Sequence, residues 1–386
     1  MKVLFISAGD YKYGAPKSMF ELMITLKSLY NIEPVLLTKK RTPMNDQCDK
    51  LGIENYSFWY RDIMAGSAYK NPILNCMKQC VKYALYLYGG VTKHFIDSVG
   101  INFDEIDLIH TNVNRNDIGC FLSKKYNIPH IWHLREHGIE DYRVCIYKPR
   151  IYQYMNNHAD VFVAISHSVK NTWVKMGLPD DKIRVIYNGL DTRGYRDKKQ
   201  NDRNIVRIAM TGHIQPTKGQ EQLIKALGLL DEKYLKRLHV DLWGEAYSDY
   251  KLHLLRLIKQ YHLEEVVDFC GYCNNVPQKL SEYDIGIVCS KAEGFGRVTV
   301  EYMLAGLAVI ASDTGANPEI IQDGENGLLY SYGNEKHLAR QIEKCLKDPD
   351  LIITYGKKAV ETALDKYSIA KCAENIYQLY EDVLAT

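Results

Sequence analysis

Short, almost wholly apolar runs alternate with longer segments of mixed polarity along most of this chain. Parallel strands covered by helices on both faces have this pattern, because neither face of such a strand meets water. The first half of the chain holds such runs at residues 2–9, 33–40, 55–60, 107–112, 128–134, 161–166 and 183–189. The segments between them can form crossover helices, so the pattern predicts an α/β fold with a parallel, doubly wound sheet.

The pattern stops once, at the polar stretch DTRGYRDKKQNDRN (191–204), which has no periodicity and is predicted to be a linker. It then restarts, with apolar runs at 205–212, 238–244, 266–271, 284–290, 307–313 and 327–330. Two such series predict two doubly wound, Rossmann-like domains facing a cleft, residues 1–190 and 205–367. The loops at the carboxyl ends of both sets of strands should line that cleft. An amphipathic segment at 368–385 is expected to pack back onto the first domain.

The composition fits a globular protein without strong electrostatic bias. The 386 residues suffice for two domains of ordinary size. The 49 Lys and Arg nearly balance 47 Asp and Glu, and the formal charge of +2 argues against a nucleic-acid partner. The start, MKVLFISAGD, lacks a signal-peptide cleavage site, and no stretch approaches the ~20 apolar residues of a membrane span. With ten cysteines and no export signal, we expect a cytoplasmic protein with reduced thiols.

Residues 56–95 are rich in Tyr and Leu, with Lys70, Lys78, Lys82 and Lys93 among them. One interpretation is a set of helices that pack through apolar faces within the first domain. The other is a surface that holds the acceptor or makes peripheral contact with the inner face of the membrane. Lysines beside aromatic and aliphatic side chains are typical of helices that lie in a lipid interface.

The stretch KAEGFGRVTVEYMLA (291–305) follows the apolar run DIGIVCS and opens a predicted helix. Unpaired N–H groups and the dipole at a helix start attract an anion such as a phosphate, and glycines let the backbone approach it closely. Glu301, one turn into the helix, could then accept hydrogen bonds from a ribose, and Glu293 could hold sugar hydroxyls. A nucleotide sugar has this order of groups. The alternative is two solvated acids beside a tight turn.

The segment EGFGRVTVEYMLAGLAVIASDTGANPEIIQDGENGLLY resembles the donor-site signature of the GT-B-fold retaining glycosyltransferases of family 4, whose mark is a Glu-x7-Glu pair. VIYNGLD (185–191) and TGHIQPTKG (211–219) also match family segments. The resemblance implies the GT-B architecture and a metal-independent hexosyltransferase that needs no cofactor. Its donor would be a UDP- or GDP-sugar. Its acceptor would be a glycan or a lipid-linked saccharide, as in cell-surface polysaccharide synthesis.

The resemblance also implies roles for individual residues. It places Glu293, His133 and Lys218 in catalysis, with His133 binding a hydroxyl or assisting proton movement near the reacting end of the sugar. The acceptor side would include Lys17, Arg135 and Glu136. The residues implied in donor binding are Gly14, His213, Lys218, Gly271, Tyr272, Asn274, Glu293, Gly294, Phe295, Gly296, Arg297, Val298, Thr299 and Glu301. For His133, a structural role at the end of a strand remains the alternative.

His213 departs from the family pattern, which has arginine there. Arginine is always charged and binds phosphate through two parallel hydrogen bonds, whereas free histidine has a pKa of ~6.5 and is only partly charged at neutral pH. The change either weakens leaving-group stabilisation or depends on the diphosphate to keep the imidazole charged. Activity is therefore expected to fall as the pH rises above neutral, and less so in a His213→Arg variant.

Four other motifs do not favour a catalytic or metal site. His133-Leu-Arg-Glu136-His137 has zinc-peptidase spacing, but Gly138 and the preceding strand argue against the helix that this chemistry needs. Cys270 and Cys273 lack a second pair. GDYKYGAPKS (9–18) nearly forms a P-loop, but proline interrupts it. Asp348-Pro349-Asp350 is predicted to cap a helix rather than to bind a metal.

Two other functions remain open at this point. A sugar-nucleotide epimerase shares the architecture and would turn over UDP-N-acetylglucosamine without an acceptor. A non-catalytic glycosyltransferase-like partner subunit is the second alternative, because His213 replaces the expected arginine. Slow nucleotide release from a donor without acceptor would identify an active enzyme.

Overall fold

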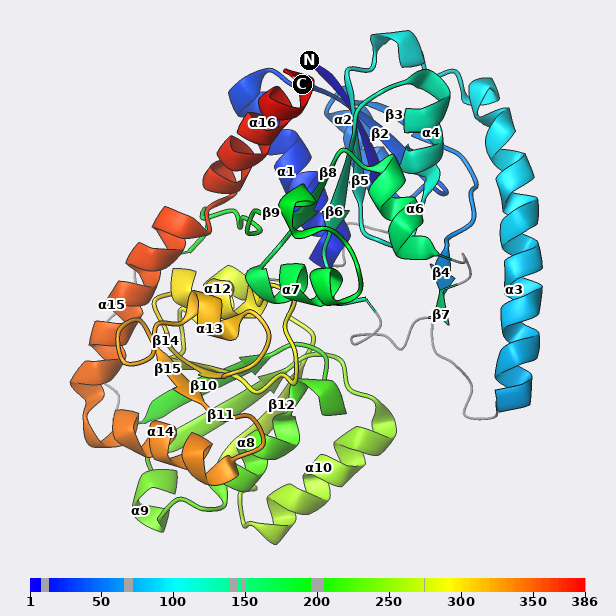
Figure 1. Ribbon diagram of the computed structural model, residues 1–386. Coiled ribbons are helices and arrows are strands. Elements are labelled where there is room, and N and C mark those ends of the chain that lie inside the picture. Colours follow the sequence, from blue (N-terminus) through cyan, green and yellow to red (C-terminus); the bar gives the residue numbers. More distant parts are fainter. Residues whose placement is uncertain are drawn as a thin grey trace. The chain divides into compact units, whose positions relative to one another are not determined.

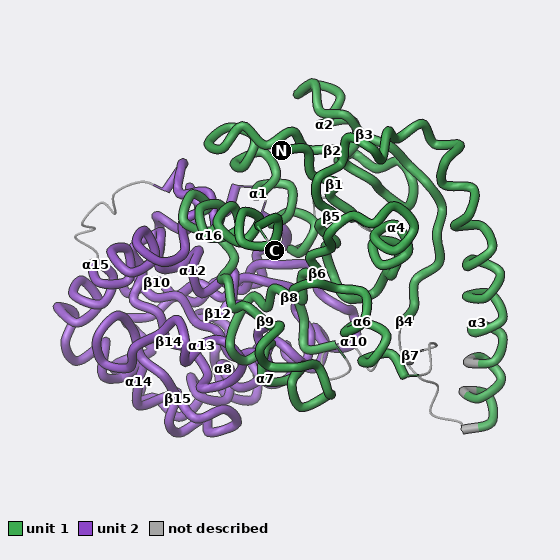
Figure 2. Tube along the Cα trace, turned by 45° about the horizontal axis from the view of Figure 1, so that its top comes forward, with its two compact units in different colours: residues 1–189, 369–386 green, residues 190–368 purple. Residues whose placement is uncertain are grey.

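The computed structural model describes residues 1–7, 14–65, 72–138, 145–146, 150–195, 205–273 and 275–385. The chain divides into two compact units. Unit 1 comprises residues 1–189 and 369–386, and unit 2 comprises residues 190–368 (Figure 2). The sequence placed the boundary at residue 190. Of the expected linker, residues 191–195 belong to unit 2, and 196–204 lie outside the described residues.

Unit 1 is built on a seven-stranded sheet in the order β3-β2-β1-β5-β6-β8-β9. Every neighbouring pair in it is parallel, as the apolar runs predict. A short antiparallel pair, β4 (Met64–Ala65) and β7 (Cys145–Ile146), stands apart from it. The strands of the main sheet are β1 (Lys2–Ser7), β2 (Glu33–Thr38), β3 (Glu54–Ser57), β5 (Leu108–Asn112), β6 (His130–Leu134), β8 (Val161–Ala164) and β9 (Ile183–Val185).

Helices cover both faces of this sheet (Figure 1). Val3 and Phe5 of β1 belong to a core that includes α1 and α16, whereas Leu4 and Ile6 belong to the core on the opposite face. The C-terminal helix α16 packs beside α1 with Tyr377 stacked on Tyr30, ring centroids 4.4 Å apart. The α-helices of unit 1 include α1 (Gly14–Tyr30), α2 (Pro43–Lys50), α3 (Pro72–Thr92), α4 (Ile118–Tyr126), α6 (Ile151–His158), α7 (His167–Lys175) and α16 (Ile369–Leu384).

Unit 2 holds a six-stranded sheet in the order β12-β11-β10-β13-β14-β15, again parallel throughout. Its strands are β10 (Val206–Thr211), β11 (Leu238–Trp243), β12 (Val267–Gly271), β13 (Ile285–Val288), β14 (Ala308–Ser312) and β15 (Leu328–Tyr330). Its helices include α8 (Gln220–Leu227), α9 (Glu232–Leu235), α10 (Ser248–Gln260), α11 (Val276–Leu280), α12 (Arg297–Leu304), α13 (Asn317–Ile320), α14 (Glu335–Lys347) and α15 (Pro349–Lys366). The fold class predicted from the sequence, two parallel-sheet α/β domains, is confirmed.

Two further predictions concern single helices. Asp348 is the N-cap of α15, and its side chain accepts a hydrogen bond from the backbone N–H of Asp350 at 3.2 Å. The interpretation of the Asp-Pro-Asp motif as a helix cap is therefore confirmed. Within the described residues, none of the helices has both the length and the apolarity required to cross a membrane.

Candidate functional site

The strand order of unit 2 identifies where a ligand can bind. From β10 the chain crosses to β11 on one side, and from β13 it crosses to β14 on the other. The loops that follow β10 and β13 therefore diverge, and a ligand can settle between the carboxyl ends of these two strands. These loops are residues 212–219 and 289–296, which contain six of the donor-binding residues expected from the sequence, and the second loop leads directly to four more.

The two loops meet each other. The backbone N–H of Lys291 donates to the carbonyl of Thr217 at 3.0 Å. Gly219 has a left-handed φ of 76°, and a Cβ there would overlap the carbonyl oxygen of Cys289. A glycine is therefore needed for this close approach, which fixes the position of the preceding Lys218.

Lys218 and Glu293, one from each loop, form an ion pair with Nζ 2.6 Å from Oε1. Their side chains are 29% and 15% exposed, so the pair is reachable but sheltered. The sequence assigned the lysine to the diphosphate and the glutamate to sugar hydroxyls, and the structure brings the two together. An incoming anion would compete with the carboxylate for the ammonium group and leave the carboxylate ready to accept hydrogen bonds.

Helix α12 begins directly after the loop that carries Glu293. Gly296, at φ 82°, precedes the helix and no side chain caps it. The first N–H groups of a helix have no acceptor within it, so those at Val298 and Thr299 can face an anion. Glu301 lies one turn further on, with Oε1 3.2 Å from Nε of Arg297. The two acids of the Glu-x7-Glu pair thus each have a basic neighbour in this structure.

Buried contacts hold this loop in place. The hydroxyl of Thr299 donates to Oδ1 of Asn317 at 2.9 Å, and both side chains are buried. The backbone N–H of Ala316 donates to the carbonyl of Glu293 at 2.9 Å. Gly315, at φ 60°, packs so tightly that a Cβ would overlap the backbone nitrogen of Glu293. Sequence analysis gave Gly315 no role, and its place within the quoted signature SDTGANPE was the only signal.

A pocket of about 450 Å³ lies at the carboxyl ends of β10, β11 and β12. Its lining includes Ile214, Phe269, Gly271 and Tyr272. The sequence expected this edge to meet the base of the nucleotide, and both Gly271 and Tyr272 are exposed there. Asn274, assigned to the same edge, lies outside the described residues.

His213 is exposed in the loop after β10, and its backbone carbonyl accepts a hydrogen bond from Nε2 of Gln220 at 3.1 Å. Gly294 and Phe295 belong to the loop of Glu293, where Phe295 is buried with its ring 5.8 Å from that of Tyr367. The structure therefore gives Phe295 a packing role rather than a surface that meets the donor.

In unit 1, the corresponding divergence of loops lies between β1 and β5. His133, on the adjacent β6, is only 1% exposed, with Nδ1 3.0 Å from Nε2 of His110. The His133 side chain thus forms a hydrogen bond with a neighbouring side chain, as the alternative interpretation of a structural role expects. Its other ring nitrogen, Nε2, has no hydrogen-bond partner among the described residues.

The residues expected on the acceptor side differ in exposure. Arg135 is 7% exposed and donates to the side-chain oxygens of Asn112 and Asn188. Glu136 is 9% exposed and accepts two hydrogen bonds from Arg115, at 2.9 and 3.1 Å. Only Lys17 is well exposed, with its side chain 46% accessible and 3.9 Å from Glu21. Gly14, the first residue of α1, is also exposed.

The zinc-peptidase spacing has no matching geometry. His133 lies on a strand and His137 in the following loop, where its Nε2 is 2.9 Å from the hydroxyl of Ser168. The two histidines therefore do not share a helical face. Cys270 and Cys273 are both free thiols, and the Cys270 thiol donates to Oδ1 of Asp241 at 3.2 Å.

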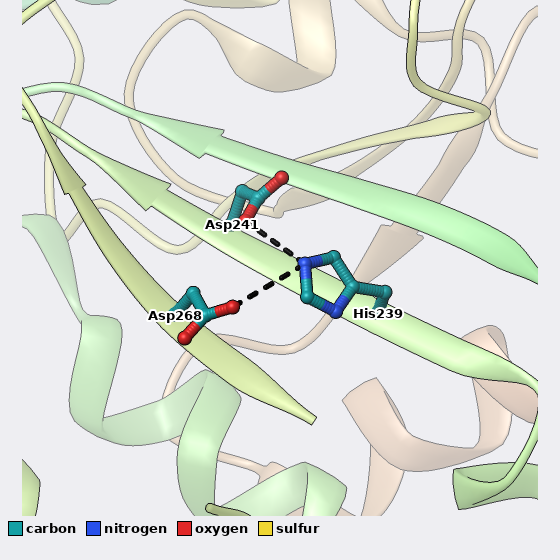
Figure 3. A group of neighbouring side chains, drawn as sticks. All are labelled: His239, Asp241 and Asp268. Atoms are coloured by element: carbon teal, nitrogen blue, oxygen red, sulfur yellow. Dashed lines mark hydrogen bonds and ion pairs between the residues drawn. The ribbon is translucent and has the colours of Figure 1, made fainter. Parts of the chain in front are cut away.

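One group of possible metal ligands lies elsewhere on the unit 2 sheet (Figure 3). Nε2 of His239 is 3.1 Å from Oδ1 of Asp241 and 3.6 Å from Oδ2 of Asp268. The other oxygen of Asp241 already accepts hydrogen bonds from Tyr283 at 2.6 Å and Arg207 at 2.9 Å. Although burial alone would raise it, these hydrogen bonds hold the pKa of Asp241 below its usual value. The arginine already neutralises this carboxylate, so a cation is not needed here.

Two family models match the chain. "Glycosyltransferase Family 4" covers residues 84–193, and "Glycosyl transferases group 1" covers residues 191–362. The two matches meet close to the boundary between the units, and together they cover four strands of the unit 1 sheet, β5, β6, β8 and β9, and the whole unit 2 sheet.

Similar proteins and solved structures agree with these family matches. N-acetyl-alpha-D-glucosaminyl L-malate synthase of Bacillus anthracis is 28% identical over 237 residues, 58% of this chain and 60% of that protein. An uncharacterized glycosyltransferase of Methanocaldococcus jannaschii is 28% identical over 82% of this chain and 86% of its own length. The crystal structure of Anabaena HepE in complex with UDP superimposes with a TM-score of 0.77, at 21% identity, and covers 99% of this chain and 100% of that one. With its fold, its Glu-x7-Glu loop and both family matches, the chain belongs to the GT-B glycosyltransferases of family 4.

Proposed function

We propose that this protein transfers a sugar from a nucleotide-sugar donor to a saccharide acceptor in polysaccharide synthesis. The observation that carries the proposal is the contact of Lys218 with Glu293, 2.6 Å apart, in the loops that follow β10 and β13, the second of which leads into α12. A basic group, a helix start and two carboxylates within one pair of loops match the charges and hydroxyls of a nucleotide sugar.

The donor would lie along the carboxyl edge of the unit 2 sheet. Its base would occupy the pocket beside Gly271 and Tyr272, and its ribose would reach Glu301. The diphosphate would rest on Lys218 and the start of α12, and the sugar would reach Glu293. Anabaena HepE was solved with UDP, which makes a UDP-sugar the first donor to test.

We further propose that transfer proceeds with retention and without a metal ion. The departing diphosphate needs positive charge that is already in position when the bond breaks. Lys218, His213 and the N–H groups of α12 can supply it. Asp348 and Asp350, the remaining acidic motif considered for a metal, form a helix cap instead. Activity that survives a chelator would support this step, and a requirement for added Mn²⁺ would refute it.

A peripheral contact with the inner face of the membrane is the proposed route to a lipid-linked acceptor. Helix α3 turns an apolar face outward: Ile73, Met77, Val81, Tyr88 and Val91 are each between 59% and 72% exposed. These residues follow each other at helical spacing, so they share one side. The sequence has no acidic residue between Asp62 and Asp97, which suits an anionic lipid surface.

The structure corrects one part of the sequence argument for this surface. Lys93 was counted among its lysines, but it is buried in unit 1 and paired with Asp117. Lys70 lies outside the described residues. Lys78 and Lys82 are partly exposed on α3 and remain candidates for contacts with lipid phosphates.

Cosedimentation with vesicles tests this contact. We expect the protein to bind vesicles containing phosphatidylglycerol more strongly than vesicles of phosphatidylcholine alone. Val81→Glu should weaken binding at least several-fold, because it places a charge on the apolar face. Leu252→Glu is the matched control, since Leu252 is 54% exposed on a helix of unit 2. Equal binding by both variants and the wild type would exclude α3 as the contact.

The central experiment measures thermal stabilisation by a panel of nucleotide sugars, followed by nucleotide release with and without acceptor. A specific donor should add about 2.7 kcal/mol of stability at a hundredfold excess over Kd. Slow release of nucleotide without acceptor, and faster release with it, would support a transferase. Turnover of UDP-N-acetylglucosamine without acceptor would indicate the epimerase instead. Binding without any turnover would indicate a non-catalytic partner subunit.

A further inference from the structure

A second pocket, of about 770 Å³, lies within unit 1 along β3, the edge strand of its sheet. Its lining comes from the segment after β2, from β3 and the residues that follow it, and from the short 3₁₀ helix η1 (Lys93–Val99). Strand β2 separates β3 from β1, so this edge-strand pocket is distinct from the divergence of loops between β1 and β5. None of the residues expected to bind the donor or the acceptor lines it.

Two aromatic side chains of the edge-strand pocket are exposed to solvent. Trp59, in the segment after β3, is 45% exposed, and Phe95, on η1, is 65% exposed. Large apolar side chains gathered at one place on a surface are typical of a binding site. A flat ring can stack on the face of a sugar where the C–H bonds point, and this contact removes apolar surface of both partners from water.

Polar groups with unused hydrogen-bonding capacity lie beside these two rings. Arg41 donates to Asp46 and Asp49 through Nε and Nη2, whereas its Nη1 has no such bond among the described residues. The hydroxyls of Thr92 and Ser98 donate to backbone carbonyls at 2.8 and 2.7 Å, so each oxygen keeps lone pairs that can accept. Sugar hydroxyls both donate and accept, and they can use all three groups.

The charge of the pocket favours a neutral ligand. Within the described lining, Arg41 alone is charged, and the carboxylates of Asp46 and Asp49 balance it. An anionic ligand would meet these two carboxylates beside the guanidinium group. A lipid chain would cover the polar groups without replacing their hydrogen bonds to water, which is costly. A neutral saccharide offers both hydroxyls and apolar faces.

The two sides of the pocket are tied together within unit 1. The hydroxyl of Tyr56, on β3, donates to the carbonyl of Gly100, directly after η1, at 3.4 Å. The backbone N–H of Phe58 donates to the carbonyl of Thr38, at the end of β2, at 2.9 Å. A pocket that is already formed loses little conformational freedom when a ligand binds.

We propose that the edge-strand pocket is a second saccharide-binding site, which holds a neutral stretch of the acceptor glycan. Trp59 and Phe95 stack on sugar rings, and Arg41 donates to a sugar oxygen through Nη1. The inference rests on the proposed function, because that function supplies the glycan. A glycan that binds here stays with the protein, which raises its effective concentration at the site of transfer. Long acceptors should therefore be used better than short ones.

Tryptophan fluorescence reports on this pocket without any donor. Of the four tryptophans, Trp132 and Trp173 are at most 1% exposed and Trp243 is half-buried, so Trp59 is the most exposed. An array of neutral glycans of one to eight sugar units identifies the saccharide, which is then titrated in solution. We expect it to shift the emission to shorter wavelength and to protect Trp59 from quenching by acrylamide. Trp59→Phe should abolish the shift and keep most of the affinity, because an aromatic ring remains.

Calorimetry with the same glycan tests the second ring. Phe95→Ala should weaken binding about tenfold, because the stacked aromatic surface is lost. Leu29→Ala is the matched control, since Leu29 is 56% exposed on α1 of the same unit, and it should change nothing. Absence of any neutral glycan that binds, or equal binding by Phe95→Ala and the wild type, would overturn the proposal. Stronger binding of an anionic glycan or of a soluble prenyl alcohol would overturn it too.

Turnover separates this proposal from the proposed function. Phe95→Ala should raise the KM of a long acceptor about tenfold and leave the KM of the donor unchanged. Glycan binding that depends on Phe95, in a protein that transfers no sugar, would support the pocket while refuting the proposed function. Sugar transfer in which Phe95→Ala leaves the KM of a long acceptor unchanged would support the function and refute the pocket.

Discussion

At the scale of single residues, the ion pair between Lys218 and Glu293 links the sequence motif to a mechanism. Both side chains are partly sheltered, and each compensates the charge of the other in this structure. A diphosphate carries more negative charge than one carboxylate, so it can take the ammonium group from Glu293. Before the donor binds, the ion pair would hold both side chains in position.

Replacing Lys218 by methionine removes the charge and keeps most of the side-chain length. We expect kcat/KM to fall by about 10²–10³, because a preorganised charge at the leaving group is lost. Stability should change by about 1 kcal/mol or less, since the pair is partly exposed. Lys225→Met is the control, because Lys225 makes a similar ion pair with Glu221, at 2.7 Å, on the surface of α8. A comparable loss of kcat/KM in both variants would contradict the role of Lys218.

The positions of Lys218, Glu293 and Glu301 beside strand ends and a helix start could be predicted from the sequence, because each belongs to a short motif next to a recognisable strand or helix. Their roles in donor binding stay predictions. The side chains that His110 contacts, those of His133 and Tyr380, could not be predicted. Tyr380 and His110 are 270 positions apart, and no local pattern records that their side chains touch. Arg135 and Glu136 show the same limit, since their position after a strand predicted a binding role but not their burial.

At the scale of secondary structure, strand positions followed closely from the apolar runs. The run at 33–40 contains β2 (Glu33–Thr38), and the run at 107–112 contains β5 (Leu108–Asn112). Buried parallel strands are apolar throughout, and this property does not depend on distant contacts. The loops depend on such contacts, as Gly315 shows: its conformation matters because Glu293 lies against it.

Gly315→Ala tests this dependence. The new methyl group would both require a left-handed backbone and overlap the backbone of Glu293. Gly324→Ala is a matched control, because Gly324 has φ 77° and no atom within 4 Å of its Cβ position. The control should lose about 1–2 kcal/mol of stability from the backbone strain alone. Gly315→Ala should lose more and should also weaken donor binding, as measured by calorimetry with the nucleotide. Equal effects on binding would show that Gly315 does not position Glu293.

At the scale of the whole molecule, the two units differ in their buried histidines. His110, His130 and His133 all lie in the unit 1 sheet and are at most 1% exposed. Burial lowers the pKa of His130 to about 4 and that of His110 to about 3, and it pushes the pKa of His133 well below its ordinary value. Within the described part of unit 2, no histidine is buried. Acid should therefore act first on unit 1.

The direction of this effect follows from proton binding. An unfolded histidine takes up a proton near pH ~6.5, whereas the folded forms of these three stay neutral until much lower pH. The unfolded state thus binds more protons as the pH falls, and each buried histidine removes up to ~1.4 kcal/mol of stability per pH unit. Between pH 6.5 and 5 most carboxylates remain ionised in both states, so the histidines should dominate the change in stability.

Hydrogen exchange at pH 7 and pH 5 should show a larger loss of protection in the strands of unit 1 than in those of unit 2. His130→Gln, which keeps a polar group beside Thr111 and lies outside the proposed site, should reduce the dependence on pH by about a third. The same loss of protection in both units, or an unchanged dependence in this variant, would show that these buried histidines do not control the acid stability of unit 1.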